Sequence, residues 1–186
     1  MKLNLGCGSK ILENYINLDK FDYYNPNVVH DLEVTPYPFE DNSVDEIILR
    51  HILEHVGQNP DIFHNIIKEL YRICKNKSII EITVPHPRHD DFLSDPTHVR
   101  PITIEGLQLY DKENNKKWQK EGYTNTPFGL ILDVNFKILK VDLKLDEKYK
   151  KLIDEKKMSP HDIFEITQKY NNVVKEMKIL WSVVKD

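Results

Sequence analysis

The chain has 186 residues, of which 40 % are hydrophobic and 30 % are charged, and its formal net charge is −4. This length suits one domain with a single core, and the acidic balance counts against a nucleic-acid partner, which needs a basic surface facing the phosphates. No apolar run reaches the roughly 20 residues that cross a bilayer, and no export signal precedes the first strand-like run. We therefore expect one domain over residues 1–186, located in the cytoplasm, without membrane contact and with both cysteines reduced.

The chain opens with an apolar run that breaks into a Gly-x-Gly turn, Leu3-Asn4-Leu5-Gly6-Cys7-Gly8. A second apolar run follows, and Asp19 stands at its end. Glycines let the backbone approach a ligand without a Cβ in the way, and a carboxylate accepts hydrogen bonds from ribose hydroxyls. This order of strand, glycine turn, strand and carboxylate is typical of an open α/β sheet that binds a nucleoside-like cofactor.

Apolar runs and helical stretches then alternate, which favours a mainly parallel sheet with crossover helices. The clearest helix is expected from about Pro60 to Cys74, because Asn59 can cap it and Pro60 suits its first position. The run Ile79–Val84 is nearly all apolar and predicts a strand buried on both faces. The strands that we expect in this half are Lys2–Leu5, Tyr15–Leu18, Val28–His30, Glu46–Arg50 and Ile79–Val84.

The last third of the chain has a different pattern. Phe136–Leu145 and Met177–Val184 alternate in part, which predicts an antiparallel strand pair closing one edge of the sheet. The segment between them, about Asp146 to Val174, is too long for a tight hairpin and is expected to be helical. A helix should start at Ser159-Pro160, with an inward apolar face made of Ile163, Phe164 and Ile166.

Five short motifs occur in one order over about the first 100 residues and together resemble the small class I S-adenosylmethionine-dependent methyltransferases. They are Leu3–Gly8, Ile16–Asp19, His30–Leu32, Pro38–Asp45 and Leu53–Val56. The resemblance implies a Rossmann-like α/β fold, a three-layer sandwich with a mostly parallel seven-stranded sheet and an antiparallel C-terminal strand pair. It also implies S-adenosylmethionine as cofactor, with S-adenosylhomocysteine as product.

The resemblance further implies which residues contact the cofactor. Gly6 and Gly8 are expected to pass under its methionine and ribose parts. Asp19 is expected to bind the ribose hydroxyls, and Asp31 the adenine amino group. The complete expected set is Asn4, Leu5, Gly6, Cys7, Gly8, Asp19, Asp31, Leu32, Arg50 and His51, of which the last two are expected on the methionine side.

The first loop departs from the common pattern of this family. Asn4 stands where many relatives have an acid, and Lys10 stands where a third glycine is usual. Only 10 residues, Ser9 to Leu18, separate Gly8 from Asp19, which leaves little room for a first crossover helix. These departures also count against a nicotinamide dinucleotide, which needs a helix N-terminus for its pyrophosphate.

The segment Pro85–Pro101 follows the fifth expected strand and contains three histidines, three aspartates and two arginines. Similar Asp-Pro-Thr-His-x-Arg segments lie near the acceptor pocket in some methyltransferases of this type. An oxygen acceptor benefits from a base that titrates near neutral pH. We expect His98 and then His86 as catalytic residues, with Asp95 orienting a histidine or the acceptor. The alternative is a turn and helix cap folded onto the core.

Two further interpretations concern the segment Pro85–Pro101 and the motif Leu53–Val56. Possible metal ligands are present at His86, His89, Asp90, Asp95 and His98, but their spacing matches no familiar closed site. We therefore assign no metal, and metal binding by this loop stays open as an alternative. Glu54 and His55 are expected to cap or brace the following helix.

The sequence thus predicts transfer of a methyl group to an oxygen or nitrogen atom of a small molecule or glycan. The cofactor half is expected in residues 1–100, and the acceptor pocket in segments 85–130 and 146–174. Two alternatives remain open: a non-catalytic subunit that binds S-adenosylmethionine for regulation or scaffolding, and an NAD(P)-dependent oxidoreductase.

Overall fold

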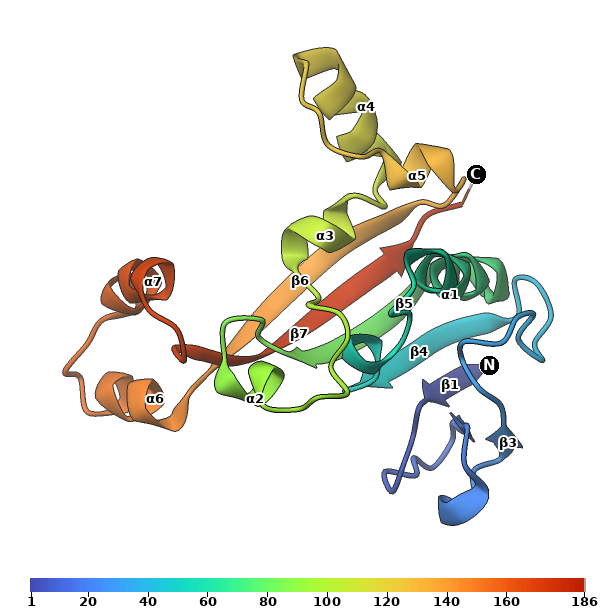
Figure 1. Ribbon diagram of the computed structural model, residues 1–186, viewed down its shortest axis with the longest axis horizontal. Helices are drawn as coiled ribbons and strands as arrows, with labels where there is room; N and C mark the ends of the chain where they lie inside the picture. Colours follow the sequence, from blue (N-terminus) through green and yellow to red (C-terminus); the bar gives the residue numbers. More distant parts are fainter. Residues whose placement is uncertain (186) are drawn as a thin grey trace.

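Seven strands form one mixed sheet in the order β3-β2-β1-β4-β5-β7-β6 (Figure 1). The computed structural model describes residues 1–185. Strands β1 to β5 pair in parallel, and β7 runs antiparallel to both of its neighbours, β5 and β6. The strands are β1 (Lys2–Leu5), β2 (Ile16–Asp19), β3 (Val28–Val29), β4 (Val44–Arg50), β5 (Cys74–Pro85), β6 (Phe136–Leu145) and β7 (Val174–Val183). This arrangement confirms the predicted Rossmann-like, mostly parallel seven-stranded sheet and the antiparallel strands at the C-terminal edge.

The helices are short, apart from α1 in the crossover from β4 to β5. Two 3-10 turns, η1 (Asp22–Tyr24) and η2 (Leu53–His55), follow β2 and β4. The α-helices are α1 (Pro60–Ile73), α2 (Asp90–Leu93), α3 (Ile104–Gln108), α4 (Lys112–Glu121), α5 (Phe128–Ile131), α6 (Glu147–Asp154) and α7 (Pro160–Lys169). Within residues 1–185, none of them combines the length and the apolar character that a membrane span requires.

The hydrophobic core lies between α1 and one face of the sheet. The side chain of Asn59 caps α1 by accepting from the amide of Asp61, and Pro60 occupies the first turn. Buried side chains of α1 pack with alternate residues of the strands. These residues are Phe63, Ile66, Ile67, Leu70 and Ile73 of α1, and Leu3, Leu5, Ile47, Leu49, Ile80, Ile82, Val84, Ile179 and Trp181 of the sheet.

The opposite face of the sheet is polar and partly open to solvent. Ion pairs join neighbouring strands there: Lys2 with Glu46 at 2.7 Å, and Glu81 with Lys178 at 2.7 Å. The prediction that Ile79–Val84 is buried on both faces is therefore wrong, because Ile79, Glu81 and Thr83 are only half-buried. Their side chains alternate with buried neighbours, which is the pattern of a strand covered on one side.

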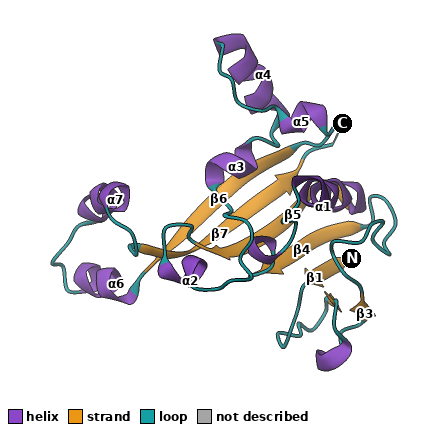
Figure 2. Cartoon of the chain, in the orientation of Figure 1, coloured by secondary structure: helices purple, strands orange, loops and turns teal. Residues whose placement is uncertain are grey.

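Within residues 1–185, the first three crossovers contain no α-helix and consist of loops with the short 3-10 turn η1, as Figure 2 shows around β1 and β3. Residues 6–15 form no helix, in agreement with the short spacing between Gly8 and Asp19. The side-chain amide of Asn4 anchors this loop by donating to the carbonyl of Lys10 and to Oδ1 of Asn17, each at 2.8 Å. Hydrogen bonds between the side chains of Asn4 and Asn17 and the backbone thus fix a loop that contains no helix.

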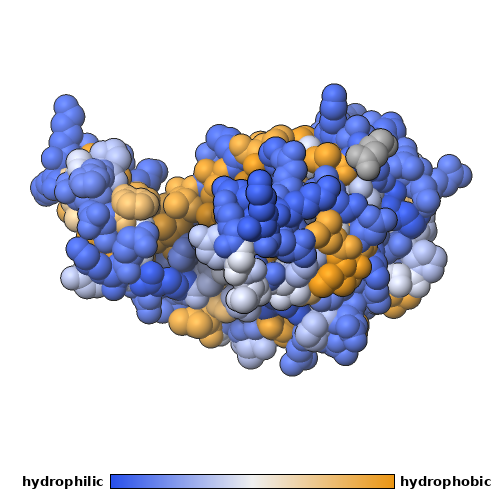
Figure 3. Space-filling model, turned by 90° about the horizontal axis from the view of Figure 1, so that it is seen from above, coloured by the Kyte–Doolittle hydropathy of each residue, from blue (hydrophilic) through white to orange (hydrophobic). Residues whose placement is uncertain are grey.

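Helices α6 and α7 form an extension between β6 and β7, which stands out as a lobe at the left of Figures 1 and 3. The predicted start of α7 is confirmed by a capping box between Ser159 and Asp162. Its predicted inward face is only partly correct: Ile163 is buried, whereas Phe164 is 61 % exposed. Phe164 lies one residue further round the helix, and the small extension offers nothing to cover it.

Candidate functional site

A cavity of about 640 Å³ opens where the carboxyl ends of β1 and β2 meet the loop after β3. Ligands of open α/β sheets bind at this edge. The lining residues are Gly6, Gly8, Leu18, Asp19, Lys20, Phe21, Tyr23, Tyr24, His30, Asp31, Leu32, Glu33, Ile52, His55, Val56 and Thr97. Of the ten predicted cofactor residues, five line it: Gly6, Gly8, Asp19, Asp31 and Leu32.

The carboxylate of Asp19 is held at the cavity wall by the backbone. Its Oδ2 accepts from the amide of Gly8 at 2.8 Å, and its Oδ1 accepts from the amide of Phe21 at 3.1 Å. Gly8 has a φ of +47°, and a Cβ added there would meet no atom within 4 Å. The turn therefore leaves open space beside a fixed carboxylate, and this combination fits the sugar and methionine parts of S-adenosylmethionine.

Asp31 lies on the loop after β3 and lines the same cavity. Its Oδ1 accepts from the amide of Glu33 at 3.0 Å, which fixes the turn. The next residue, Leu32, is buried while lining the cavity, and its carbonyl accepts from the hydroxyl of Tyr37 at 2.9 Å. Two carboxylates from neighbouring strand ends thus border one cavity with an apolar wall between them.

Three of the other predicted cofactor residues lie behind the turn and do not line the cavity. Asn4, Leu5 and Cys7 are buried. The amide of Cys7 donates to the carbonyl of Leu18 at 3.0 Å, which joins the turn to β2. Burial raises the pKa of the Cys7 thiol. Asn4, Leu5 and Cys7 therefore support the conformation of the glycine turn from the protein interior.

Arg50 and His51 lie on another side of the sheet edge. Arg50 pairs with Glu81 on the polar face at 3.6 Å. Nδ1 of His51 is 3.2 Å from Oε1 of Glu54, and its Nε2 is 3.0 Å from Oε2 of Glu176. The hydrogen bond to Glu54 raises the pKa of His51. Neither residue lines the large cavity, so their expected contact with the methionine part lacks support from this geometry.

The histidine-rich segment reaches the cavity through Thr97. The hydroxyl of Thr97 donates to Oδ1 of Asp95 at 2.6 Å, and it lies 2.9 Å from Nδ1 of His55. Of the three predicted catalytic residues, Asp95 is therefore linked to the cavity wall through Thr97, without lining it.

His98 and His86, the two predicted bases, also stand back from the cavity. The largely buried ring of His98 stacks on Phe92 and lies 4.6 Å from the ring of His55, which does line the cavity. His86 is half-buried, and its Nδ1 accepts from the amide of Arg88 at 3.2 Å. Burial, followed by the charge of Arg88, lowers the pKa of His86.

Sequence reasoning missed the aromatic rim of the cavity and assigned His55 only a structural role. Phe21, Tyr23 and Tyr24 follow Asp19 directly and are all exposed while lining the cavity. Three aromatic residues within four positions of a strand-end turn are a signal that was available in the sequence. Exposed aromatic surface beside a cavity is typical of a binding site.

The comparisons with known proteins concern the family and the fold. Residues 3–82 match the sequence profile of a family described as a methyltransferase domain. No curated protein gives a significant sequence match. A solved S-adenosylmethionine-dependent methyltransferase from Archaeoglobus fulgidus has 20 % identity and a TM-score of 0.59, over 97 % of this chain and 85 % of that one. An S-adenosylmethionine-dependent methyltransferase from Methanosarcina mazei has 13 % identity and a TM-score of 0.54, over 100 % and 92 %.

A third solved structure, the [4+2]-cyclase SpnF, has 13 % identity and a TM-score of 0.53, over 100 % of this chain and 74 % of that one. At these identities the likeness shows the fold alone. The family match over residues 3–82 and the fold agree with the prediction that S-adenosylmethionine is the cofactor. Residues 3–82 therefore carry the signature of the methyltransferase domain, and the chain has the class I fold of the S-adenosylmethionine-dependent methyltransferases.

Proposed function

We propose that this protein transfers a methyl group from S-adenosylmethionine to an oxygen or nitrogen atom of a small molecule or glycan. The observation that carries the proposal is the pair of carboxylates, Asp19 and Asp31, bordering one cavity beside an open glycine turn. When bound, S-adenosylmethionine supplies the electrophilic methyl group.

The residues of this chain would divide the binding as follows. Asp19, fixed by two backbone amides, accepts hydrogen bonds from the ribose hydroxyls. Asp31 accepts from the adenine amino group, and the buried side chain of Leu32 packs against the ring. Gly8 provides the space that a side chain would fill. The exposed aromatic rings of Tyr23 and Tyr24 cover the cofactor from the solvent side.

The acceptor would enter beside His55 and Thr97. Both residues line the cavity, and they come from segments that do not carry Asp19 or Asp31. Methyl transfer is an in-line displacement, so alignment of the acceptor is the main task of these side chains. For an oxygen acceptor we infer that proton removal depends on the His55–His98 pair, with Asp95 holding Thr97 in place. In this arrangement His55 faces the acceptor, and His98 contacts the ring of His55 without lining the cavity.

The decisive experiment is calorimetry with S-adenosylhomocysteine, with NADH as the competing ligand. Methyl transfer from radiolabelled S-adenosylmethionine into fractionated cell extract would then reveal the acceptor class. Saturable binding of S-adenosylhomocysteine and label in an extract fraction support the proposal. Binding without any label would favour a regulatory or scaffolding subunit, and preference for NADH would favour the oxidoreductase.

A further inference from the structure

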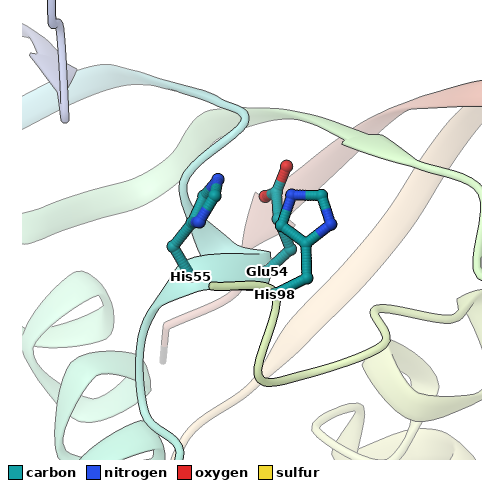
Figure 4. Close-up of side chains that lie close together, drawn as sticks. All are labelled: Glu54, His55 and His98. Atoms are coloured by element: carbon teal, nitrogen blue, oxygen red, sulfur yellow. The ribbon is translucent and has the colours of Figure 1, made fainter. Parts of the chain in front are cut away.

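We propose that Glu54, His55 and His98 bind a divalent first-row transition-metal cation, such as Zn²⁺ or Mn²⁺, in the wall of the cofactor cavity. One ligand atom from each of the three residues lies within 4.8 Å of the other two (Figure 4). The residues come from two segments, since η2 carries Glu54 and His55, whereas His98 belongs to the loop after α2. Of the five metal ligands considered from the sequence, only His98 belongs to this cluster.

A buried carboxylate oxygen is the strongest sign of a missing ligand. Glu54 is fully buried, and its Oε2 has no hydrogen-bond partner among residues 1–185. Its Oε1 is engaged by His51 at 3.2 Å, which leaves Oε2 as the free atom. Buried polar atoms in folded proteins nearly always have a partner, so this oxygen calls for one. A cation beside the two imidazoles would supply it.

The hydrogen bonds around the cluster leave one nitrogen of each imidazole ready to bind a metal. Nδ1 of His98 lies 2.7 Å from the carbonyl of Phe92, so it must carry the proton, and Nε2 keeps its lone pair. The hydroxyl of Thr97 already donates to Asp95, so it accepts from Nδ1 of His55, and Nε2 of His55 is also left with its lone pair. Metal-binding histidines nearly always donate their other nitrogen in this way.

The donor set indicates the kind of cation. Two imidazoles and one carboxylate suit zinc, manganese or iron in the divalent state, whereas Mg²⁺ prefers oxygen ligands and retains its water. Ligand atoms about 2.1 Å from a cation lie closer together than those of the present cluster, so small side-chain rotations would close the site. Three protein ligands leave at least one coordination position open, as in catalytic zinc sites.

The location of the cluster suggests what the open position would bind. His55 lines the cofactor cavity, so a cation held by His55 lies at the cavity wall. A hydroxyl oxygen of the acceptor bound to this cation would lose its proton to solvent more readily. With the cation bound, His55 and His98 would promote proton removal as its ligands, since neither imidazole would keep a free nitrogen to act as the base. This second step rests on the proposed function and would narrow the acceptor to a hydroxyl compound; the cation site itself does not depend on it.

The test is calorimetry of untagged, chelator-treated full-length protein with ZnCl₂, MnCl₂ and MgCl₂ in turn. We expect one equivalent of Zn²⁺ or Mn²⁺ to bind more tightly than Mg²⁺. Glu54→Gln, which keeps the shape of the side chain, and His98→Ala should each weaken this binding by roughly 100-fold or more. Thr97→Val, which removes the hydroxyl that accepts from His55 and donates to Asp95, should weaken it by about 10-fold. His161→Ala, at an exposed histidine of α7, is the matched control and should bind as the wild type does.

Thermal unfolding gives an independent measurement of the same site. Added Zn²⁺ should raise the melting temperature of the wild type and of His161→Ala in a concentration-dependent way, and should raise that of Glu54→Gln much less at the same concentration. Absence of saturable binding, or equal affinity in wild type, Glu54→Gln and His98→Ala, would overturn the inference. S-adenosylhomocysteine titrated into the same chelated protein tests the proposed function separately, since its binding needs Asp19 and no cation.

Discussion

The amide of Gly8 donates a hydrogen bond to Oδ2 of Asp19 at 2.8 Å, which ties the first glycine turn to the end of the second strand. The turn and the carboxylate therefore form one unit, although 10 residues separate them in the sequence. We expect the ribose of the cofactor to bind at this unit, so a substitution of Asp19 should affect cofactor binding directly.

Asp19→Asn should weaken binding of S-adenosylhomocysteine by about 10-fold to 100-fold, because hydrogen bonds to a charged group contribute about 1.5–3 kcal/mol. The asparagine keeps one acceptor oxygen and can retain one of the two hydrogen bonds from the backbone amides, so circular dichroism should verify that the turn and the fold persist. Asp22→Asn, on η1 and outside the cavity lining, is the matched control. Equal affinity of both variants, measured by calorimetry, would contradict the role of Asp19.

The two glycines of the first turn should respond differently to alanine. A Cβ at Gly6 would lie 2.5 Å from Cδ1 and Cγ1 of Ile52, so Gly6→Ala should reduce the free energy of unfolding by about 1–3 kcal/mol. At Gly8 a Cβ would meet no atom of the non-adjacent residues of 1–185 within 4 Å, and the positive φ alone costs about 1–2 kcal/mol.

Gly8→Ala should instead impair ligand binding more than Gly6→Ala does, because its methyl group would occupy space that we assign to the cofactor. Urea denaturation compares the stabilities, and calorimetry with S-adenosylhomocysteine compares the affinities. Tighter binding by Gly8→Ala than by Gly6→Ala, each corrected for its folded fraction, would show that the cofactor does not lie over Gly8.

His98→Ala should separate binding from turnover. Because His98 does not line the cavity, affinity for S-adenosylhomocysteine should stay unchanged. Methyl transfer should fall by about 100-fold or more, the usual loss when acid–base chemistry is removed. Circular dichroism should verify the fold, since the ring stacks on Phe92. Normal turnover by this variant would disprove the catalytic assignment while leaving the cofactor site intact.

The stability of the protein should depend on pH through His64. This ring packs 4.5 Å from that of Phe128, and burial lowers its pKa, aided by Arg100 and Lys68 against the opposing charge of Asp61. The unfolded chain therefore takes up a proton near pH 6.5 that the folded chain does not yet bind, and the free energy of unfolding should decrease below about that pH.

Urea denaturation at about pH 7.5 and pH 5.5 measures this dependence. His64→Gln has no proton to bind and should lose less stability between the two pH values than the wild type does. His161→Gln, at an exposed position, controls for the removal of a histidine. An identical loss of stability in wild type and His64→Gln would exclude this contribution.

The sequence was sufficient for much of the fold because the relevant signals are local. Lys2–Leu5 and Phe136–Leu145 match the observed strands, and the Asn59-Pro60 start of α1 is correct. The face of β5 that is open to solvent was not predictable from its own residues, since Ile79 is as apolar as Ile80. Ile79 is partly exposed because no layer of helices covers this face of the sheet within residues 1–185. Whether such a layer forms depends on the crossovers between other strands.

The site shows the same division. Asp19 and Asp31 line the cavity, and both follow strands whose ends meet at one edge. The positions of His55 and His98 depend on how the segment after β5 folds back, since the amide of Val99 donates to the carbonyl of Glu54 at 2.8 Å. A contact between residues so far apart in sequence has no signature in either segment. The sequence therefore did not indicate that His55 would line the cavity and that His98 would lie behind it.

The charged face of the sheet has a consequence for association between copies of this protein. An uncovered sheet ordinarily invites stacking against a second one, because apolar strand residues gain from being removed from water. Here Lys2, Glu46, Glu81 and Lys178 already pair with one another in solvent. Stacking would dehydrate these pairs, and burying charges costs more than their mutual attraction returns. The charged face of the sheet can thus remain exposed to solvent without a covering layer of helices, and it does not promote association between copies of the protein.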